Sequence, residues 1–81
     1  MSSFQEYYYK NVGNRIRMLR IQHGLTQEQL SELLLKNDKY IGHIERCERK
    51  ISQKILIQIL ELFKISPSDF FNFEKYNFTV D

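Results

Sequence analysis

The middle of the chain carries helix stop and start signals so close together that only short helices fit between them. Gly24 is a residue type typical of the position just after a helix. Thr26, followed three residues later by Gln29, has the pattern of a capping box, in which each side chain bonds the backbone of the other residue. Asn37 is a competent N-cap for a further helix. Residues 26–46 are therefore predicted to form two short helices joined by a tight turn.

Apolar residues on both sides of this helix pair recur at helical spacing, with little strict alternation. A first helix is expected from near Ser3 to Gly24, and a fourth helix is expected after Ser52. Ser66 before Pro67 marks the start of a short fifth helix, because proline is favoured at the first helical position. The chain is therefore expected to be all-α, a compact bundle of five short helices with the helix pair at its centre.

A length of 81 residues predicts a single domain over residues 1–81, and so small a domain often gains stability by pairing with a copy of itself. Alternating apolar and polar side chains predict a short C-terminal strand over residues 76–80. The aromatic residues near the chain ends exceed what so small a core needs, so residues 52–81 are expected to supply a homodimer interface. Its candidate residues are Leu60, Phe63, Phe71, Phe73, Tyr76 and Phe78. The alternative is that such aromatics close the domain's own core, which is the role expected for Phe70.

Charge is unevenly distributed along the chain. Residues 10–54 contain ten Lys or Arg and five Asp or Glu, whereas residues 55–81 contain two and four. The basic part includes the helix pair, although charge alone does not reject an ordinary solvated surface. A single cysteine excludes an internal disulfide framework, and neither a membrane-spanning run nor a signal peptide is recognisable. A cytoplasmic protein without membrane contact is therefore expected.

The helix that begins at Asn37 has two contrasting faces. Ile41 and Ile44 are placed on its inner face, toward the core. The opposite face offers hydrogen-bond donors and acceptors at successive turns, which suit the base edges of double-stranded DNA in the major groove. Its candidate residues are Asn37, Asp38, Lys39, Tyr40, His43 and Arg46, with Gly42 allowing a close approach to the duplex. The helix pair favours this interpretation over the alternative of solvated residues on an amphipathic helix.

Contacts to the DNA phosphates are expected beside the helix pair. Gln27 opens the second helix, where its side-chain amide and the free backbone N–H groups would together hold a phosphate oxygen. Lys50, in the loop after the third helix, is the strongest further candidate. Lys10, Arg15, Arg17 and Arg49 are additional ones, although a solvated position is the better interpretation for each of these cations taken singly.

The most telling segments are Arg20, Gly24 to Leu30, Ile41 with Ile44-Glu45-Arg46, and Ile65-Ser66-Pro67-Ser68-Asp69. Together they resemble the Cro/repressor type of helix-turn-helix domain, often called the XRE family, over residues 16–71. The resemblance implies a sequence-specific DNA-binding transcriptional regulator, and it implies the phosphate role of Gln27. It also implies that Arg20 and Glu45 form a partly buried ion pair between the first and third helices. The segment Tyr40 to Arg46 and the small size look most like the controller proteins of restriction-modification systems.

The expected homodimer would place two recognition helices about 34 Å apart, which suits a palindromic operator. Two other functions remain open at this point. The first is an antitoxin that neutralises a partner and represses its own operon, and the second is a protein-interaction module that has kept the helix pair without binding DNA.

Four positions depart from the family pattern. Leu35 occupies the turn between the second and third helices, where a glycine is usual and a left-handed backbone would strain leucine. Cys47 stands where a glycine commonly follows the third helix. Ser31 replaces a usual alanine, and Lys36 replaces a usual core residue. A reshaped turn and a tilted recognition helix are therefore expected.

No set of residues predicts a catalytic or metal centre. Cys47 and His43 lie one helical turn apart, but no further ligand stands at a suitable spacing, so no metal and no cofactor is expected. No set of nucleophile, base and orienting residue and no glycine-rich phosphate loop is recognisable, which argues against an enzyme. No small-molecule effector is evident.

Overall fold

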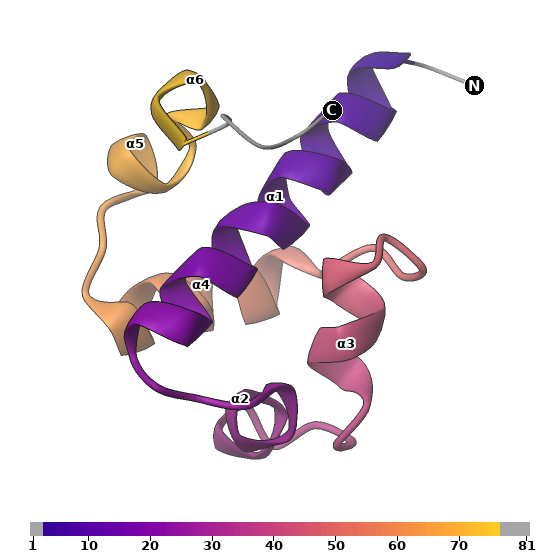
Figure 1. Cartoon of the computed structure of the whole chain (residues 1–81), viewed down its shortest axis with the longest axis vertical. Helices are drawn as coiled ribbons and strands as arrows, with labels where there is room; N and C mark the ends of the chain where they lie inside the picture. Colours follow the sequence, from indigo (N-terminus) through magenta and orange to yellow (C-terminus); the bar gives the residue numbers. More distant parts are fainter. Residues whose placement is uncertain (1–2, 77–81) are drawn as a thin grey trace.

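The computed structural model describes residues 3–76, and within this range all regular structure is helical. Its helices are α1 (Ser3–Gln22), α2 (Gln27–Leu33), α3 (Tyr40–Glu45), α4 (Gln53–Phe63), α5 (Pro67–Phe70) and α6 (Phe73–Tyr76). α1 runs diagonally through the molecule, with α2 and α3 on one side and α5 and α6 on the other (Figure 1). The all-α expectation is confirmed, with one helix more than the sequence predicted.

The additional helix replaces the start of the expected C-terminal strand. Tyr76 is the last residue of α6, so the strand prediction is wrong at this position, while residues 77–81 lie outside the described range. Asn72 favours the helical turn, because its side-chain oxygen accepts a hydrogen bond from the Lys75 N–H at 3.4 Å. Phe73 then packs edge to face on Tyr7 of α1, with ring centroids 6.0 Å apart. This contact holds α6 against α1.

The hydrophobic core lies between α1, the helix pair α2 and α3, and α4. Its buried residues are Val12, Ile16, Leu19, Leu30, Leu34, Tyr40, Ile41, Ile44, Ile51, Ile55, Leu56, Ile59 and Phe70. Those of α1 recur every three or four residues, as the helical spacing of the sequence predicted. Full burial of one such side chain contributes about 1.5–3 kcal/mol to folding. Phe70 is fully buried, so the expectation that it belongs to the core is confirmed.

Within residues 3–76, each of the first four helices is followed within two residues by a residue in the left-handed conformation, and only the first of these is a glycine: Gly24, Leu35, Cys47 and Lys64. At the turn after α2, the Lys36 N–H donates to the Ser31 carbonyl at 2.9 Å, which is the closing bond of a Schellman motif. The expected reshaping of this turn is therefore wrong, because Leu35 itself adopts the left-handed conformation at φ 58°. That conformation costs a non-glycine residue roughly 1–2 kcal/mol. Leu35 is 92% exposed, so burial of its side chain does not offset the cost.

Candidate nucleic-acid interface

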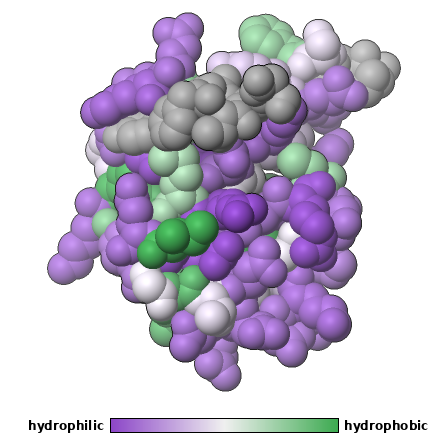
Figure 2. All heavy atoms as spheres, in the orientation of Figure 1, coloured by the Kyte–Doolittle hydropathy of each residue, from purple (hydrophilic) through white to green (hydrophobic). Residues whose placement is uncertain are grey.

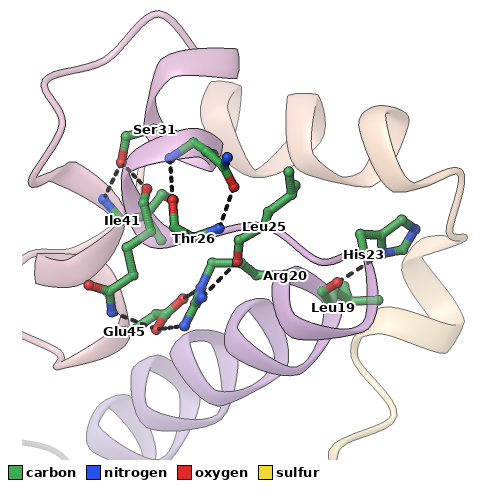
Figure 3. A network of polar contacts seen from close by, with 10 residues as sticks. Leu19, Arg20, His23, Leu25, Thr26, Ser31, Ile41 and Glu45 are labelled. Carbon is green, nitrogen blue, oxygen red and sulfur yellow. Dashed lines mark hydrogen bonds and ion pairs between the residues drawn. The ribbon is translucent and has the colours of Figure 1, made fainter.

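α2 begins as the sequence predicted, and it also holds the start of α3. The capping box is complete, since Thr26 Oγ1 accepts from the Gln29 N–H at 3.0 Å and Gln29 Oε1 accepts from the Thr26 N–H at 2.8 Å. The buried Ser31 hydroxyl donates to the Gln27 carbonyl at 2.8 Å and accepts from the Ile41 N–H at 3.0 Å (Figure 3). Because α3 has no side-chain cap of its own, Ser31 satisfies one of its first backbone donors. Sequence reasoning had noted Ser31 only as the replacement of a usual alanine.

α3 begins at Tyr40, so the predicted N-cap at Asn37 is wrong by two residues. The Asn37 side chain instead caps the preceding turn, where its Oδ1 accepts from the Lys39 N–H at 2.9 Å. Asn37, Asp38 and Lys39 are all exposed. These three candidates for base contacts therefore lie on the turn that leads into α3.

Arg20 and Glu45 join α1 to the end of α3. Arg20 Nε donates to Glu45 Oε2 at 2.7 Å and Arg20 Nη2 donates to Glu45 Oε1 at 3.1 Å, which is a bidentate ion pair (Figure 3). Arg20 Nη1 also donates to the Leu25 carbonyl at 2.9 Å, just before α2. The side chains are only 12% and 4% exposed. One guanidinium thus fixes the relative positions of α1, the start of α2 and the end of α3.

Gln27 takes part in the same network. Its Nε2 donates to Glu45 Oε1 at 2.9 Å, so the side-chain amide points toward the end of α3. The phosphate contact expected from Gln27 would have to replace this bond or use the backbone N–H groups at the start of α2. Sequence reasoning did not anticipate the bond to Glu45, because the two residues are far apart in the chain.

Two of the positions expected on the outward face of α3 are buried. Tyr40 is 4% exposed, with Lys36 Nζ at 5.3 Å and the Arg49 guanidinium at 5.2 Å from its ring centroid. The prediction that Tyr40 contacts DNA is therefore corrected, because its ring belongs to the core. Gly42 is also buried, and a Cβ built there would lie 3.1 Å from Arg46 Nη1 and 3.4 Å from Arg46 Nη2. The Arg46 guanidinium therefore covers Gly42.

The remaining outward residues of α3 contact an acidic side chain that sequence reasoning missed. His43 Nδ1 lies 2.8 Å from Glu48 Oε1, and Arg46 Nε donates to Glu48 Oε2 at 3.1 Å. All three side chains are about half exposed, and the surface over α3 is largely hydrophilic (Figure 2). The hydrogen bonds from His43 and then Arg46 lower the pKa of the Glu48 carboxyl below its ordinary value.

A basic groove runs between α1 and the loop that follows α3. It encloses about 740 Å³, and its cationic lining residues are Lys10, Arg46, Arg49 and Lys50. Lys50 Nζ lies 5.6 Å from the centroid of the Tyr9 ring, which also lines the groove. Arg15 is not part of this surface, because it is 3% exposed and pairs with Asp69 at 3.2 Å. The suggestion that Arg15 contacts phosphate is therefore wrong.

The residues expected at a dimer interface pack largely within the chain. Phe71 stacks on Tyr8 with ring centroids 6.2 Å apart, and Phe63 lies against His23 at 4.4 Å. Leu60 and Phe73 are likewise partly buried against the core. Phe78 lies outside the described range, and for Tyr76 the structure defines only its place in α6. The four partly buried residues therefore offer a partner only part of their surface.

Ile57 of α4 is an exposed apolar residue that sequence reasoning did not single out. It is 46% exposed and stands between two hollows, of about 480 Å³ and 290 Å³. Leu60 and Pro67 also line both hollows. A single apolar ridge with a hollow on either side can match a second copy of itself.

Within residues 3–76, no three His, Cys, Asp or Glu side chains form a group that could hold a metal ion. No helix in this range has the length and apolar character needed to cross a membrane. Cys47 is exposed, and its Sγ lies 3.6 Å from the Tyr9 carbonyl.

A helix-turn-helix family model (HTH_3) matches residues 16–70. The chain belongs to this family of DNA-binding transcriptional regulators. The restriction-modification controller protein C.AhdI from Aeromonas hydrophila has a similar structure, with a TM-score of 0.71 and 31% sequence identity. The match covers 80% of this chain and 98% of that one. The expectation of an XRE-type helix-turn-helix fold is thus confirmed.

Two curated relatives come from Mycobacterium tuberculosis. The HTH-type transcriptional regulator RamB is 32% identical over 59 residues, and the HTH-type transcriptional regulator PrpR is 34% identical over 58 residues. These matches cover 73% and 72% of this chain but only 12% of each relative. The similarity to RamB and PrpR is therefore confined to a small part of each protein.

Proposed function

We propose that this helix-turn-helix protein is a homodimeric, sequence-specific regulator that binds a palindromic operator, with α3 of each protomer in the major groove. The observation that carries the proposal is the fixed geometry of the helix pair. The Arg20 and Glu45 ion pair and the Ser31 hydroxyl hold both ends of α3, so the helix keeps one orientation relative to α1 and α2. A preorganised helix loses little conformational entropy when it enters the groove.

The proposed contacts fall into two groups. Asn37, Asp38, Lys39, His43 and Arg46 present exposed or half-exposed polar groups along α3 and its leading turn, where they would read base edges. Lys50 and Arg49 line the basic groove just beyond the end of α3, where they would contact phosphates together with Lys10 of α1. Gln27 would add a phosphate contact at the start of α2. The likeness to C.AhdI supports a controller-type regulator of a restriction-modification operon.

The DNA-binding proposal predicts a large effect of Lys39→Ala combined with His43→Ala. Each base contact contributes about 1–3 kcal/mol of discrimination, so the pair should lower operator affinity at least roughly 30-fold. The measurement is a fluorescence-anisotropy titration of the purified protein against DNA from upstream of its own gene and against a random duplex, at two salt concentrations.

Lys75→Ala provides the matched control, because α6 lies on the opposite side of α1 from α2 and α3 (Figure 1). This variant should bind upstream DNA like the unmodified protein. Weak binding of every variant to both duplexes, without a preference, would instead favour a protein-interaction module.

The dimer proposal predicts that Ile57→Lys gives a monomer. Ile57 is 46% exposed between two hollows that share Leu60 and Pro67 as lining residues, and a lysine there would place a charge in the apolar contact. Sedimentation equilibrium measures the change in mass. Leu33→Lys is the matched control, since Leu33 is 56% exposed but lines neither hollow. An Ile57→Lys protein that remains dimeric would move the interface elsewhere.

A further inference from the structure

Glu48 bonds to His43 of α3 and to Arg46, the residue that follows the helix. Its Oε1 lies 2.8 Å from His43 Nδ1 and its Oε2 lies 3.1 Å from Arg46 Nε. The three side chains remain between 41% and 53% exposed. They therefore form a surface cluster on the part of the protein proposed to face DNA.

The backbone after α3 places Glu48 in this position. Cys47 adopts the left-handed conformation at φ 61°, which turns the chain back over the helix end. The Glu48 N–H then donates to the His43 carbonyl at 2.8 Å. This bond places the Glu48 carboxylate beside the last turn of α3, although Glu48 follows the helix in sequence.

The ionised Glu48 carboxylate determines which nitrogen atoms of His43 and Arg46 remain available for a DNA contact. An ionised carboxylate can only accept hydrogen bonds, and the lowered pKa of Glu48 keeps it ionised at neutral pH. His43 Nδ1 must therefore carry a proton and donate, which leaves Nε2 as the ring nitrogen for a DNA contact. Arg46 is held by Nε, with its two terminal nitrogens over Gly42.

The contact with Glu48 changes how strongly Arg46 attracts DNA phosphates compared with base edges. A phosphate that approaches Arg46 also meets the Glu48 carboxylate, so attraction and repulsion largely cancel. Guanine O6 and N7 are neutral acceptors, and the carboxylate repels them far less. Glu48 therefore weakens sequence-independent attraction more than it weakens base recognition.

We propose that Glu48 is a specificity-determining residue, which holds His43 and Arg46 for base reading and withholds the Arg46 charge from phosphates. This inference rests on the proposed function of α3. Glu48 acts as a positioning residue, because its effect on DNA passes through His43 and Arg46.

Glu48→Gln tests the inference by removing the charge while keeping the side-chain shape. Release of Arg46 to one phosphate should steepen the salt dependence on random duplex by about 0.9 in log affinity per log salt. The ratio of operator to random affinity should fall about tenfold, the size of one typical base-pair mismatch. Glu28→Gln is the matched control, because Glu28 is an exposed acid in the first turn of α2, whereas the bonds of His43 and Arg46 described above run to Glu48.

Equal changes in the Glu48→Gln and Glu28→Gln proteins would reduce the effect to net charge and overturn the inference. A wild-type operator preference that survives unchanged in Glu48→Gln would also overturn it, while the proposed function would stand. Absence of any wild-type preference would instead refute the proposed function.

Nitrogen-15 NMR of the His43 ring tests the positioning without DNA. The unmodified protein should carry the proton on Nδ1, and Glu48→Ala should shift it toward Nε2. An identical ring spectrum in Glu48→Ala would overturn the positioning role.

Discussion

Glu45→Ala is expected to lower the free energy of unfolding by about 3 kcal/mol, because it leaves the largely buried Arg20 guanidinium without its carboxylate. The Arg20 side chain is only 12% exposed, and its bond to the Leu25 carbonyl would be its remaining partner in this network. Gln27 would also lose its acceptor, since its Nε2 donates to Glu45 Oε1. A small domain has a total stability of about 5–15 kcal/mol, so this loss would be a large share of it.

Thermal unfolding followed by circular dichroism measures the effect. For a domain of this size, 3 kcal/mol corresponds to a fall in Tm of at least roughly 12 °C. Glu48→Ala is the control, because Glu48 also forms an ion pair near the end of α3 but is 51% exposed. Exposed ion pairs contribute little to stability, so this control should hardly change Tm.

A paired substitution separates the loss of the ion pair from the stranding of a charge. Arg20→Met combined with Glu45→Leu removes both charges and fills similar space with apolar atoms, so much of the lost stability should return. A double variant that is less stable than Glu45→Ala would contradict this explanation. It would show that the stability loss comes mainly from losing the attraction between Arg20 and Glu45, and not from the unpaired guanidinium.

The sequence predicted those parts of the fold that depend on neighbouring residues. The capping box of Thr26 and Gln29 and the start of the fifth helix at Pro67 were placed correctly, because both signals act within one helical turn. The left-handed turn at Leu35 was recognised as a point of strain from the family pattern, in which a glycine is usual at this position. The sequence alone did not show that the backbone keeps the left-handed conformation at Leu35 despite this strain.

The parts that escaped prediction depend on contacts between distant elements. Ser31 caps α3 from α2, and Glu48 returns to His43 through a left-handed Cys47. Periodicity placed Tyr40 on the outward face, but its ring is buried where the chain enters α3. The polar side chains of the proposed interface could therefore be chosen from the sequence. The residues that bond to them, such as Glu48, could be identified only from the folded structure.

Gly13 shows the same limit, because its role depends on how closely α1 and α3 approach. It is buried within α1, and a Cβ built there would lie 2.8 Å from the Ile44 carbonyl oxygen and 3.2 Å from Glu45 Cα. These are backbone atoms, which cannot rotate away from an added methyl group. The absence of a side chain at Gly13 therefore sets the distance between α1 and α3.

Gly13→Ala is expected to destabilise the protein by about 1–2 kcal/mol, although helix propensity alone predicts the opposite sign. Alanine gains up to about 1 kcal/mol over glycine in a helix interior, whereas overpacking against rigid neighbours costs about 1–3 kcal/mol. Since the 2.8 Å contact involves backbone, the upper part of that range applies and the clash exceeds the gain. Urea unfolding measures the difference in free energy.

Gly42→Ala is the matched control for Gly13→Ala, since both glycines are helical and buried. The atoms nearest to a Cβ at Gly42 would be the ends of flexible side chains, Arg46 Nη1 and Gln27 Oε1, each at 3.1 Å. These ends can swing aside, so propensity should prevail and Gly42→Ala should match or exceed the stability of the unmodified protein. If Gly13→Ala proved equally stable, α3 would be free to shift against α1, and the fixed helix geometry on which the proposed DNA contact depends would have to be abandoned.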